Sequence, residues 1–306
     1  MGETHTVESG YDGGLGLAVE SSFNDAVTPP TKYLEIESDS FDETRNWFNS
    51  DGITGSRSRA KTGSAPTTLD PRGGARMSAL RRAELSFLLP LALGGYGGGS
   101  GYPSDDLPSF TAVKKAGGEA GVFSGCKLTR LDLESSDSAQ ALAGGFECVA
   151  AGFAAGAEED FGTPVYDVEI PLVHAGSDFQ IGGASVQVKA FKLSIANKLD
   201  ESVFRCSRTR LALPVVGKRE VSGELTLDWN AATRASVLAV WRDDAYALFQ
   251  ATFTNGLSTV VISLPYCRLA AGHAKLAKDA ALEMPVKFEA FASLPEARDE
   301  IQVFSA

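Results

Sequence analysis

Residues 221–243, VSGELTLDWNAATRASVLAVWRD, pass from an alternating strand pattern directly into a helical pattern. The part up to Leu227 predicts a strand, because apolar residues recur there at a spacing of two. Asn230 is a good N-cap for the helix that follows. One face of this helix would carry the apolar residues Ala231, Ala235, Leu238 and Trp241. The unit that decides the fold is therefore a strand followed closely by a helix.

An earlier part of the chain carries a similar unit. Thr68-Leu69-Asp70 matches Thr226-Leu227-Asp228 at a distance of 158 residues, and a helix-like segment follows both. Further along, Cys126 aligns with Cys267 at a distance of 141 residues. The drop between the two distances corresponds to the 17 residues of the Gly-rich stretch 90–106, an insertion in the first copy. Matches in a constant order indicate an internal duplication.

The duplicated pattern predicts a mainly β fold of two tandem β-sandwich or barrel modules, each flanked by one α-helix. In the first copy, Asp70 and Pro71 resemble an N-cap and an N1 proline, so we expect a helix over 75–89. In the second copy we expect the helix to span 231–243. The strands expected there cover residues 185–197, 221–227, 245–254, 259–270 and 282–292, with an Asn255-Gly256 turn between two of them.

The same pattern sets the expected domain organisation. We expect an N-terminal arm over residues 1–30 and a first module over 31–156. The acidic run Glu158-Glu159-Asp160 falls near the midpoint and indicates a linker over 157–183. A second module over 184–294 and a C-terminal tail over 295–306 complete the chain.

The composition excludes several classes of protein. Hydrophobic residues at 43% and charged residues at 22% are ordinary globular values, which excludes wholesale disorder. A net charge of −11 argues against a general nucleic-acid-binding surface. The N-terminus lacks the basic and apolar regions of a secretory signal. The longest apolar run, 85–93, is too short to cross a bilayer, so we expect no membrane insertion.

No pattern in the sequence indicates an enzyme, a metal site or a cofactor site. The cysteines Cys126, Cys148, Cys206 and Cys267 lie too far apart for a zinc motif, so we interpret them mainly as buried hydrophobes. The histidines His5, His174 and His273 form no ligand pattern, and we expect them in an arm or at strand borders. A Ser/His/Asp triad stays open, because its members need not be neighbours in sequence. The glycines of 94–101 lack the register of a phosphate-binding loop.

Several stretches resemble one family of proteins. Leu107-Pro108-Ser109-Phe110-Thr111, followed by Phe123-Ser124-Gly125-Cys126-Lys127-Leu128, is similar to consecutive strands in the tail tube proteins of long-tailed bacteriophages. The segment Glu20 to Ala26, ahead of Thr28-Pro29-Pro30, resembles the start of those proteins. Val188 to Asn197 resembles a strand of their second half. The matching stretches are scattered over nearly the whole chain.

The resemblance implies a structural virion protein, the major tail tube subunit. Such subunits form rings whose inner strands make a barrel, and the rings stack into a tube for DNA passage from capsid to host. Expected partners are further copies of the chain, a tape-measure protein, and tail terminator and baseplate proteins. The expected location is the virion tail, and the host cytoplasm during assembly. A duplicated chain would close a pseudo-sixfold ring with three subunits, and an acidic lumen would let DNA slide.

Two basic connections are candidates for contacts between stacked rings. The first, 46–66, and the second, 206–220, both read as extended hairpins or loops that leave the sheet. Their basic residues would dock on acidic surface of a neighbouring ring, or they are simply solvated. The candidate residues are Arg57, Arg59, Lys61, Arg208, Arg210, Lys218 and Arg219.

Two alternatives stay open at this level. The chain could be another ring component of a phage tail or of a tube-like secretion machine. It could also be a two-domain β-sandwich that binds glycans or a cell surface, which would predict exposed aromatic platforms.

Overall fold

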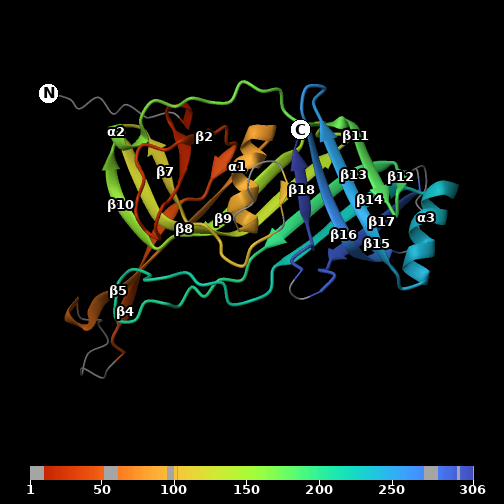
Figure 1. Ribbon diagram of the computed structural model, residues 1–306. Helices are drawn as coiled ribbons and strands as arrows, with labels where there is room; N and C mark the ends of the chain where they lie inside the picture. Colours follow the sequence, from red (N-terminus) through yellow and green to blue (C-terminus); the bar gives the residue numbers. More distant parts are fainter. Residues whose placement is uncertain are drawn as a thin grey trace.

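The computed structural model describes residues 10–51, 61–94, 100–101, 103–271, 282–294 and 297–305. The chain is mainly β, as predicted, and its strands form two halves that lie side by side (Figure 1). Among the described residues, no helix has the length and apolar character needed to cross a bilayer.

The first half contains most of the N-terminal strands and two helices. Its strands are β1 (Gly14–Val19), β2 (Lys32–Leu34), β3 (Ser38–Asp39), β4 (Asp42–Asn49), β5 (Ser64–Met77), β6 (Ser100–Gly101), β7 (Phe110–Ala116), β8 (Glu119–Ser136), β9 (Ala143–Val149) and β10 (Gly152–Ala157). Its helices are α1 (Arg82–Leu93) and α2 (Glu158–Phe161), with single 3-10 turns at Gly10–Asp12 and Lys61–Gly63.

The second half repeats the order of strands around one helix. Its elements are β11 (Val173–Ile181), β12 (Ala184–Val186), β13 (Val188–Ala196), β14 (Glu220–Asp228), α3 (Ala231–Arg242), β15 (Tyr246–Thr254), β16 (Thr259–Ala271), β17 (Glu283–Ala290) and β18 (Gln302–Ser305). The strands predicted for this half from the sequence are confirmed within a few residues of their ends.

All strand pairs are antiparallel, and they follow one order in both halves. In the first half β1 pairs with β2 and β7, β8 with β7, β9 and β10, and β5 with β9, β3 and β4. In the second half β11 pairs with β12 and β15, β16 with β15, β17 and β18, and β14 with β17 and β13.

One long strand joins the halves. The 18-residue strand β8 pairs with β7 and β10 in its first part and with β9 in its second part. That second part also pairs with β13, from Ala196↔Arg130 to Ala190↔Ser136. The main sheet is therefore continuous from β4 and β5 of the first half, through β9 and β8, to β13, β14, β17 and β16 of the second (Figure 1).

The hydrophobic core is continuous across the two halves as well. In the second half it is rich in phenylalanine: the Phe191 and Phe249 rings stack at 6.2 Å between centroids, and Phe249 and Phe288 at 5.0 Å. In the first half Phe41 packs against Phe123 at 5.1 Å. Contacts of this kind add about 0.5–1.5 kcal/mol each to the free energy gained by burial.

The helix of the second half is placed as predicted, while that of the first is not. Asn230 caps α3, its side-chain oxygen accepting a hydrogen bond from the backbone N–H of Thr233 at 2.8 Å. The buried face of α3 is nevertheless Thr233, Val237 and Leu238, because Ala231 and Ala235 are exposed.

The prediction of a helix starting at Asp70-Pro71 was wrong. Both residues belong to β5, and α1 begins only at Arg82. β9 pairs with β5 only from Arg72 onward, so Pro71 lies where the strand has a single partner and its missing N–H does little harm. The backbone N–H of Arg81 donates to Glu84 Oε2 at 2.8 Å, which caps the true start of α1.

Several predicted domain boundaries also fall inside folded elements. The expected N-terminal arm contains β1, and the expected C-terminal tail contains β18. The expected linker 157–183 contains α2, whose buried Phe161 packs on Tyr33 at 5.2 Å, and all of β11. Within this range, residues 162–172 and the two-residue turn 182–183 lie between regular elements.

Candidate functional surfaces

A groove of about 650 Å³ follows the face of the main sheet across both halves. β5, β9 and β8 line it in the first half, and β13, β14 and β17 line it in the second. Its charged lining residues are Asp39, Arg76, Arg130, Asp132, Glu134, Glu147, Lys192, Glu224 and Lys287. Five of these are acidic and four are basic, so this face is close to neutral.

Three of the four basic side chains on this face are paired with carboxylates. Arg76 donates to Glu134 at 2.6 Å, and Arg130 donates to Asp132 at 2.8 Å. Lys192, from the second half, lies 4.0 Å from the same Glu134. Pairing of this kind offsets the attraction that an unpaired guanidinium would have for a phosphate. The arrangement suits a surface that faces a polyanion without holding it.

Glycines in β5 and β14 make room for phenylalanine rings of the core. A Cβ at Gly223 would lie 2.2 Å from the Lys192 carbonyl oxygen and 2.3 Å from the Phe288 ring. A Cβ at Gly73 would lie 2.3 Å from the Phe41 ring. At both positions glycine leaves the room that a phenylalanine ring fills.

The predicted basic connection of the second half forms a strap over the first half. This strap, residues 198–219, joins β13 to β14 and runs back along the first half (Figure 1). The Arg208 carbonyl accepts from the Leu69 N–H at 2.8 Å, and the Arg210 N–H donates to the Ala151 carbonyl at 3.3 Å. The connection leaves the sheet as an extended loop, one of the two predicted forms, and it packs on the first half of its own chain.

Arg210 fixes the strap to the first half and is only 3% exposed. Its guanidinium pairs with Asp70 and donates to the Ala150 carbonyl at 3.0 Å and the Glu201 carbonyl at 2.9 Å. Burial alone would raise the pKa of the Asp70 carboxyl, but hydrogen bonds and charge from Arg210 and Arg72 lower it. Arg210 is therefore a structural residue within the chain.

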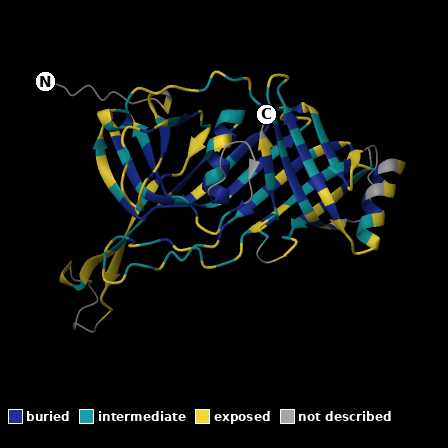
Figure 2. Cartoon of the chain, viewed as in Figure 1, coloured by how far each residue is buried: buried dark blue, intermediate teal, exposed yellow. Residues whose placement is uncertain are grey.

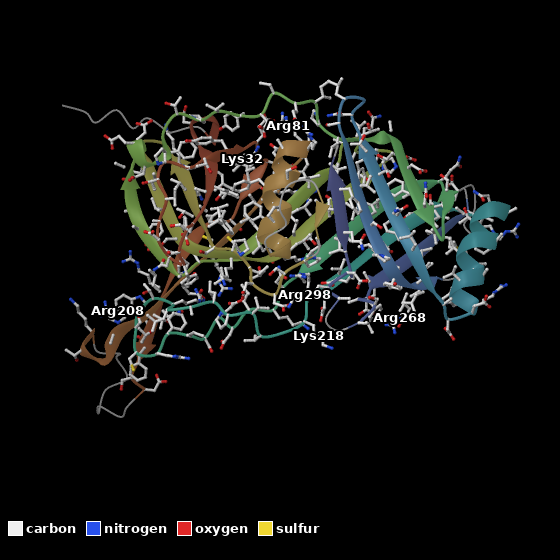
Figure 3. All side chains as sticks on the ribbon, in the orientation of Figure 1. Lys32, Arg81, Arg208, Lys218, Arg268 and Arg298 are labelled. Atoms are coloured by element: carbon white, nitrogen blue, oxygen red, sulfur yellow. The ribbon has the colours of Figure 1, made fainter. Side chains whose placement is uncertain are left out.

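Arg219 is also committed to contacts within the chain. It pairs with Glu300 at 2.9 Å and donates to the carbonyls of Leu93 and Ser104 at 3.1 and 2.7 Å. Arg210 and Arg219 thus differ from the other candidate contact residues. Arg208 and Lys218 are exposed on the strap, as Figure 3 shows, and Lys61 is exposed beside β5. Arg57 and Arg59 lie outside the described residues.

The connection between β4 and β5 projects from the body of the molecule. Figure 2 shows that the described residues of its outer part are mostly exposed. Trp47 and Phe48 are 59% and 60% exposed there. Two adjacent aromatic side chains in water are typical of a surface that a partner covers. The prediction of an extended hairpin over 46–66 is confirmed for the residues that the structure describes.

His174 lies in a buried polar cluster, which contradicts the prediction of a surface or turn position. Its Nδ1 lies 3.0 Å from Ser135 Oγ, and its Nε2 lies 2.9 Å from the Val188 carbonyl and 3.2 Å from Asp137 Oδ1. These are the residue types of a catalytic triad, but Ser135 is only 3% exposed. A nucleophile without access to solvent cannot reach a substrate, so the cluster ties β8, β11 and β13 together.

The cysteines and acidic pairs show no ligand site. Cys126, Cys148 and Cys267 are free and buried, and burial raises the pKa of the Cys267 thiol to about 12. Asp243 follows α3 directly as its C-cap, and Asp105 pairs with Arg298. Within the described ranges, His, Cys, Asp and Glu side chains nowhere gather in a group of three that would hold a metal ion.

Comparison with known proteins gives one match over nearly the whole chain. The family described as phage tail tube protein matches residues 10–293 of 306. No curated protein matches the chain. This family is structural and its members form tubes, which agrees with a long continuous sheet, a near-neutral face and an exposed hairpin. The matched region spans both halves, so the chain belongs to the phage tail tube protein family.

Proposed function

We propose that the chain is the repeating subunit of a tail tube in which rings of three chains stack around a channel for DNA. The two halves share one order of strand pairs, which supports a tandem duplication. Three such chains would supply six similar modules, the number of single-domain subunits in most rings of this kind. A ring also removes the open strand edges that would otherwise aggregate.

The observation that carries the proposal is the continuous sheet with its paired charges. Strands of both halves contribute to one groove, so a closed ring would present this face to the channel. Because Arg76, Arg130 and Lys192 have carboxylate partners, the face would offer DNA little attraction. In this proposal the lining is near-neutral, which replaces the acidic lumen expected from the sequence, and the acidic excess of the chain would lie elsewhere.

Electron microscopy of the purified chain tests the proposal. We expect tubes or stacked rings with an internal channel and pseudo-sixfold symmetry in end views. Single rings that never stack would favour a terminator or baseplate component. A persistent monomer across a wide range of concentrations would contradict a tube subunit altogether.

The exposed basic side chains Lys61, Arg208 and Lys218 stay candidates for contacts between stacked rings. Deletion of residues 51–64 tests the part near Lys61. Circular dichroism should stay unchanged, because the described residues on either side of this segment are exposed, while tubes should become shorter or fail to form. Tubes of normal length and stability would contradict a stacking role for this loop.

A further inference from the structure

The contact between the two halves supplies a template for a contact between two chains. Within the chain, β13 of the second half adds to β8 of the first, ending with the pair Ala196↔Arg130. The next residue, Asn197, is buried and donates its side-chain amide to the Leu128 carbonyl at 3.3 Å and the Ala92 carbonyl at 2.9 Å. Ala92 lies in the last turn of α1. The second half therefore extends the sheet and also covers the end of a helix.

Taking Cys126 and Cys267 as equivalent, as in the sequence alignment, the strand registers give the other equivalent residues of the two halves. They set β5 against β14 at a distance of 150 residues, so the distance of 158 expected from the sequence for these strands was wrong. Gly73 pairs with Cys148, which pairs with Leu128. In the second half, Gly223 pairs with Phe288, which pairs with Leu269. One residue further along the strands, four residues that pair in turn form a row across the sheet in each half. The row of the first half is Asp42, Arg72, Val149 and Lys127, and the equivalent row of the second half is Ser194, Ser222, Glu289 and Arg268.

Counting along the strands from these rows gives the residues equivalent to Ala196 and Arg130, which pair within the chain. Thr44 pairs with Asp70 as Ala196 pairs with Glu220, so Thr44 is equivalent to Ala196. Ala270 pairs with Lys287 as Arg130 pairs with Glu147, so Ala270 is equivalent to Arg130. The pair Ala196↔Arg130 within the chain thus predicts a pair Thr44↔Ala270 between chains.

The first partner in this pair lies on an edge that side chains cover. β3 and β4 pair with β5, and no further strand adjoins them in the part of the chain that the structure describes. The Phe41 N–H donates to Asp39 Oδ1 at 3.1 Å, and its carbonyl accepts from Lys114 Nζ at 3.2 Å. The Glu43 N–H donates to Asp42 Oδ1 at 2.8 Å. Charged side chains on an edge strand are the usual protection against uncontrolled pairing.

The second partner, Ala270, lies in the part of β16 where, among the described residues, a strand adjoins one edge and the other edge is open. β15 accompanies β16 as far as the pair Tyr246↔Arg268, whereas β17 continues to Ala271. The described residues 269–271 therefore have an adjoining strand, β17, along one edge. The equivalent part of β8 is the part on which β13 lies.

We propose that the β3–β4 edge of one chain pairs with the β16 edge of a second copy, with Thr44 opposite Ala270. The proposal rests on the proposed tube function and names the seam between neighbouring subunits of a ring. The contact is head-to-tail, since it uses the first half of one chain and the second half of the next. Head-to-tail contacts close into rings when the rotation between subunits allows it.

Charge at the end of α3 supports the same partner. Arg45 pairs with Glu43 within its own chain at 2.7 Å, and its guanidinium is exposed. Arg45 follows Thr44 as Asn197 follows Ala196, so it would approach the last turn of α3 in a neighbour as Asn197 approaches that of α1. Asp243 and Asp244 are exposed there, although acidic side chains at a helix C-terminus oppose the helix dipole. An arginine from the next chain would pair with them, which accounts for their position.

Cysteine cross-linking tests the seam. In a Cys206→Ser background, which removes the exposed thiol, the variant T44C/A270C is assembled and oxidised. Directly opposed residues of antiparallel strands have Cα atoms about 4.5–5.5 Å apart, which a disulfide accommodates. We expect covalent multimers on non-reducing gels, with three chains as the largest closed species. Each single-cysteine variant is a control.

A register control and a microscopy readout separate the possible failures. The variant T44C/R268C moves one partner two residues along the same face, and we expect at least fivefold less cross-linked product. Tubes that form without cross-linking at T44C/A270C, or with more at T44C/R268C, would overturn this seam and leave the tube function standing. A parent chain that never assembles would overturn both.

A charge exchange tests the helix contact without cysteines. R45E should raise the concentration needed for assembly about tenfold, and adding D243R should restore most of it. Circular dichroism checks that both variants fold. Unchanged assembly of R45E, or no recovery in the double variant, would overturn the contact between Arg45 and α3.

Discussion

The strap, residues 198–219, and the β4–β5 hairpin occupy the same place in the two halves, yet they end differently. The strap lies on the first half and buries Arg210 between Asp70 and two carbonyls. The hairpin extends away from the body and leaves Trp47 and Phe48 exposed (Figure 2). The strap rests on the first half of its own chain, whereas the described part of the hairpin around Trp47 and Phe48 stays exposed. Its counterpart surface would have to come from another chain.

The helices that follow these connections differ in the same way. Seven residues of α1 are buried, and the second half covers its end through Asn197 and Arg219. α3 lies at the outer end of the second half (Figure 1), and many of its described residues are exposed. The end of α1 is thus covered by the second half of the same chain, whereas a cover for the end of α3 would have to come from another chain.

Arg210→Ala should have the largest effect on the folded chain. It would leave Asp70 without its buried partner and free the carbonyls of Ala150 and Glu201. Removing one member of a buried pair costs about 3–5 kcal/mol. We expect the free energy of unfolding, measured by urea denaturation, to fall by about 3 kcal/mol.

Arg208→Ala is the matched control for the strap. Arg208 is two residues away and exposed, and its hydrogen bond to Leu69 uses only the backbone carbonyl. Surface substitutions of this kind change stability by about 0.5 kcal/mol or less. Equal losses for Arg208→Ala and Arg210→Ala would mean that the strap is not held by the buried guanidinium.

In contrast to Arg210→Ala, W47S/F48S on the hairpin should leave stability unchanged and impair assembly. Both side chains are exposed in the single chain, so the unfolding free energy should change by about 0.5 kcal/mol or less. Covered aromatic residues contribute about 1–2 kcal/mol or more each to an interface. We expect the concentration needed for assembly, followed by light scattering, to rise at least tenfold.

The exposed Val216 of the strap provides a control for this prediction. It is 63% exposed but lies on a connection that already has its partner. V216S should therefore leave both folding and assembly close to those of the parent chain. If W47S/F48S assembles as readily as V216S, the hairpin does not await a partner and the comparison of the two connections fails.

Local patterns predicted α3 and the strands from β13 to β17 of the second half, but they missed β11 and β18 and placed the helix start of the first half wrongly. Asn230 stands directly before a helical pattern and does cap α3, since the signal and the structure both lie within four residues. Asp70-Pro71 carries an equally good local signal, but pairing with β4 keeps it in a strand. That pairing joins residues distant in sequence, so a local pattern cannot predict it. Arg81, which precedes α1, is not a usual N-cap residue.

The candidate contact surfaces show the same division between local features, which the sequence predicts, and long-range packing, which it does not. The hairpin over 46–66 was predicted because its composition is polar and basic, and composition is a local property. Arg208 and Arg210 lie in the same basic segment, so the sequence does not distinguish them. Only the packing of the strap on β5 makes Arg210 buried and leaves Arg208 exposed. His174 likewise meets Ser135 across 39 residues of sequence, so nothing near it indicates burial.

Acid should loosen the strap through Asp70. Its pKa is lower in the folded chain than the ordinary value of 3.8, because the hydrogen bonds and charges of Arg210 and Arg72 outweigh burial. The stabilisation is therefore complete above pH 3.8 and is lost as the pH falls through the lower folded value. Denaturation at a series of pH values should show a fall at acidic pH that Asp70→Asn reduces. An unchanged profile in that variant would assign the acid sensitivity to other groups.

The smallest effect is expected at the covered edge. Lys114 lies over the Phe41 carbonyl and pairs with Asp39 at 2.6 Å, whereas the adjacent Lys115 pairs with Glu158 of α2, away from that edge. Lys114→Met should change the unfolding free energy by about 1 kcal/mol or less, because the ion pair is partly exposed. It should nevertheless shorten the lag before assembly, since the carbonyl becomes available to a strand from another chain. Lys115→Met is the control, and an equal lag in both variants would mean that Lys114 does not guard the edge. A shorter lag in Lys114→Met alone would show that the open edge of the first half is held back by its own side chains, while the equivalent edge of β13 is satisfied by β8.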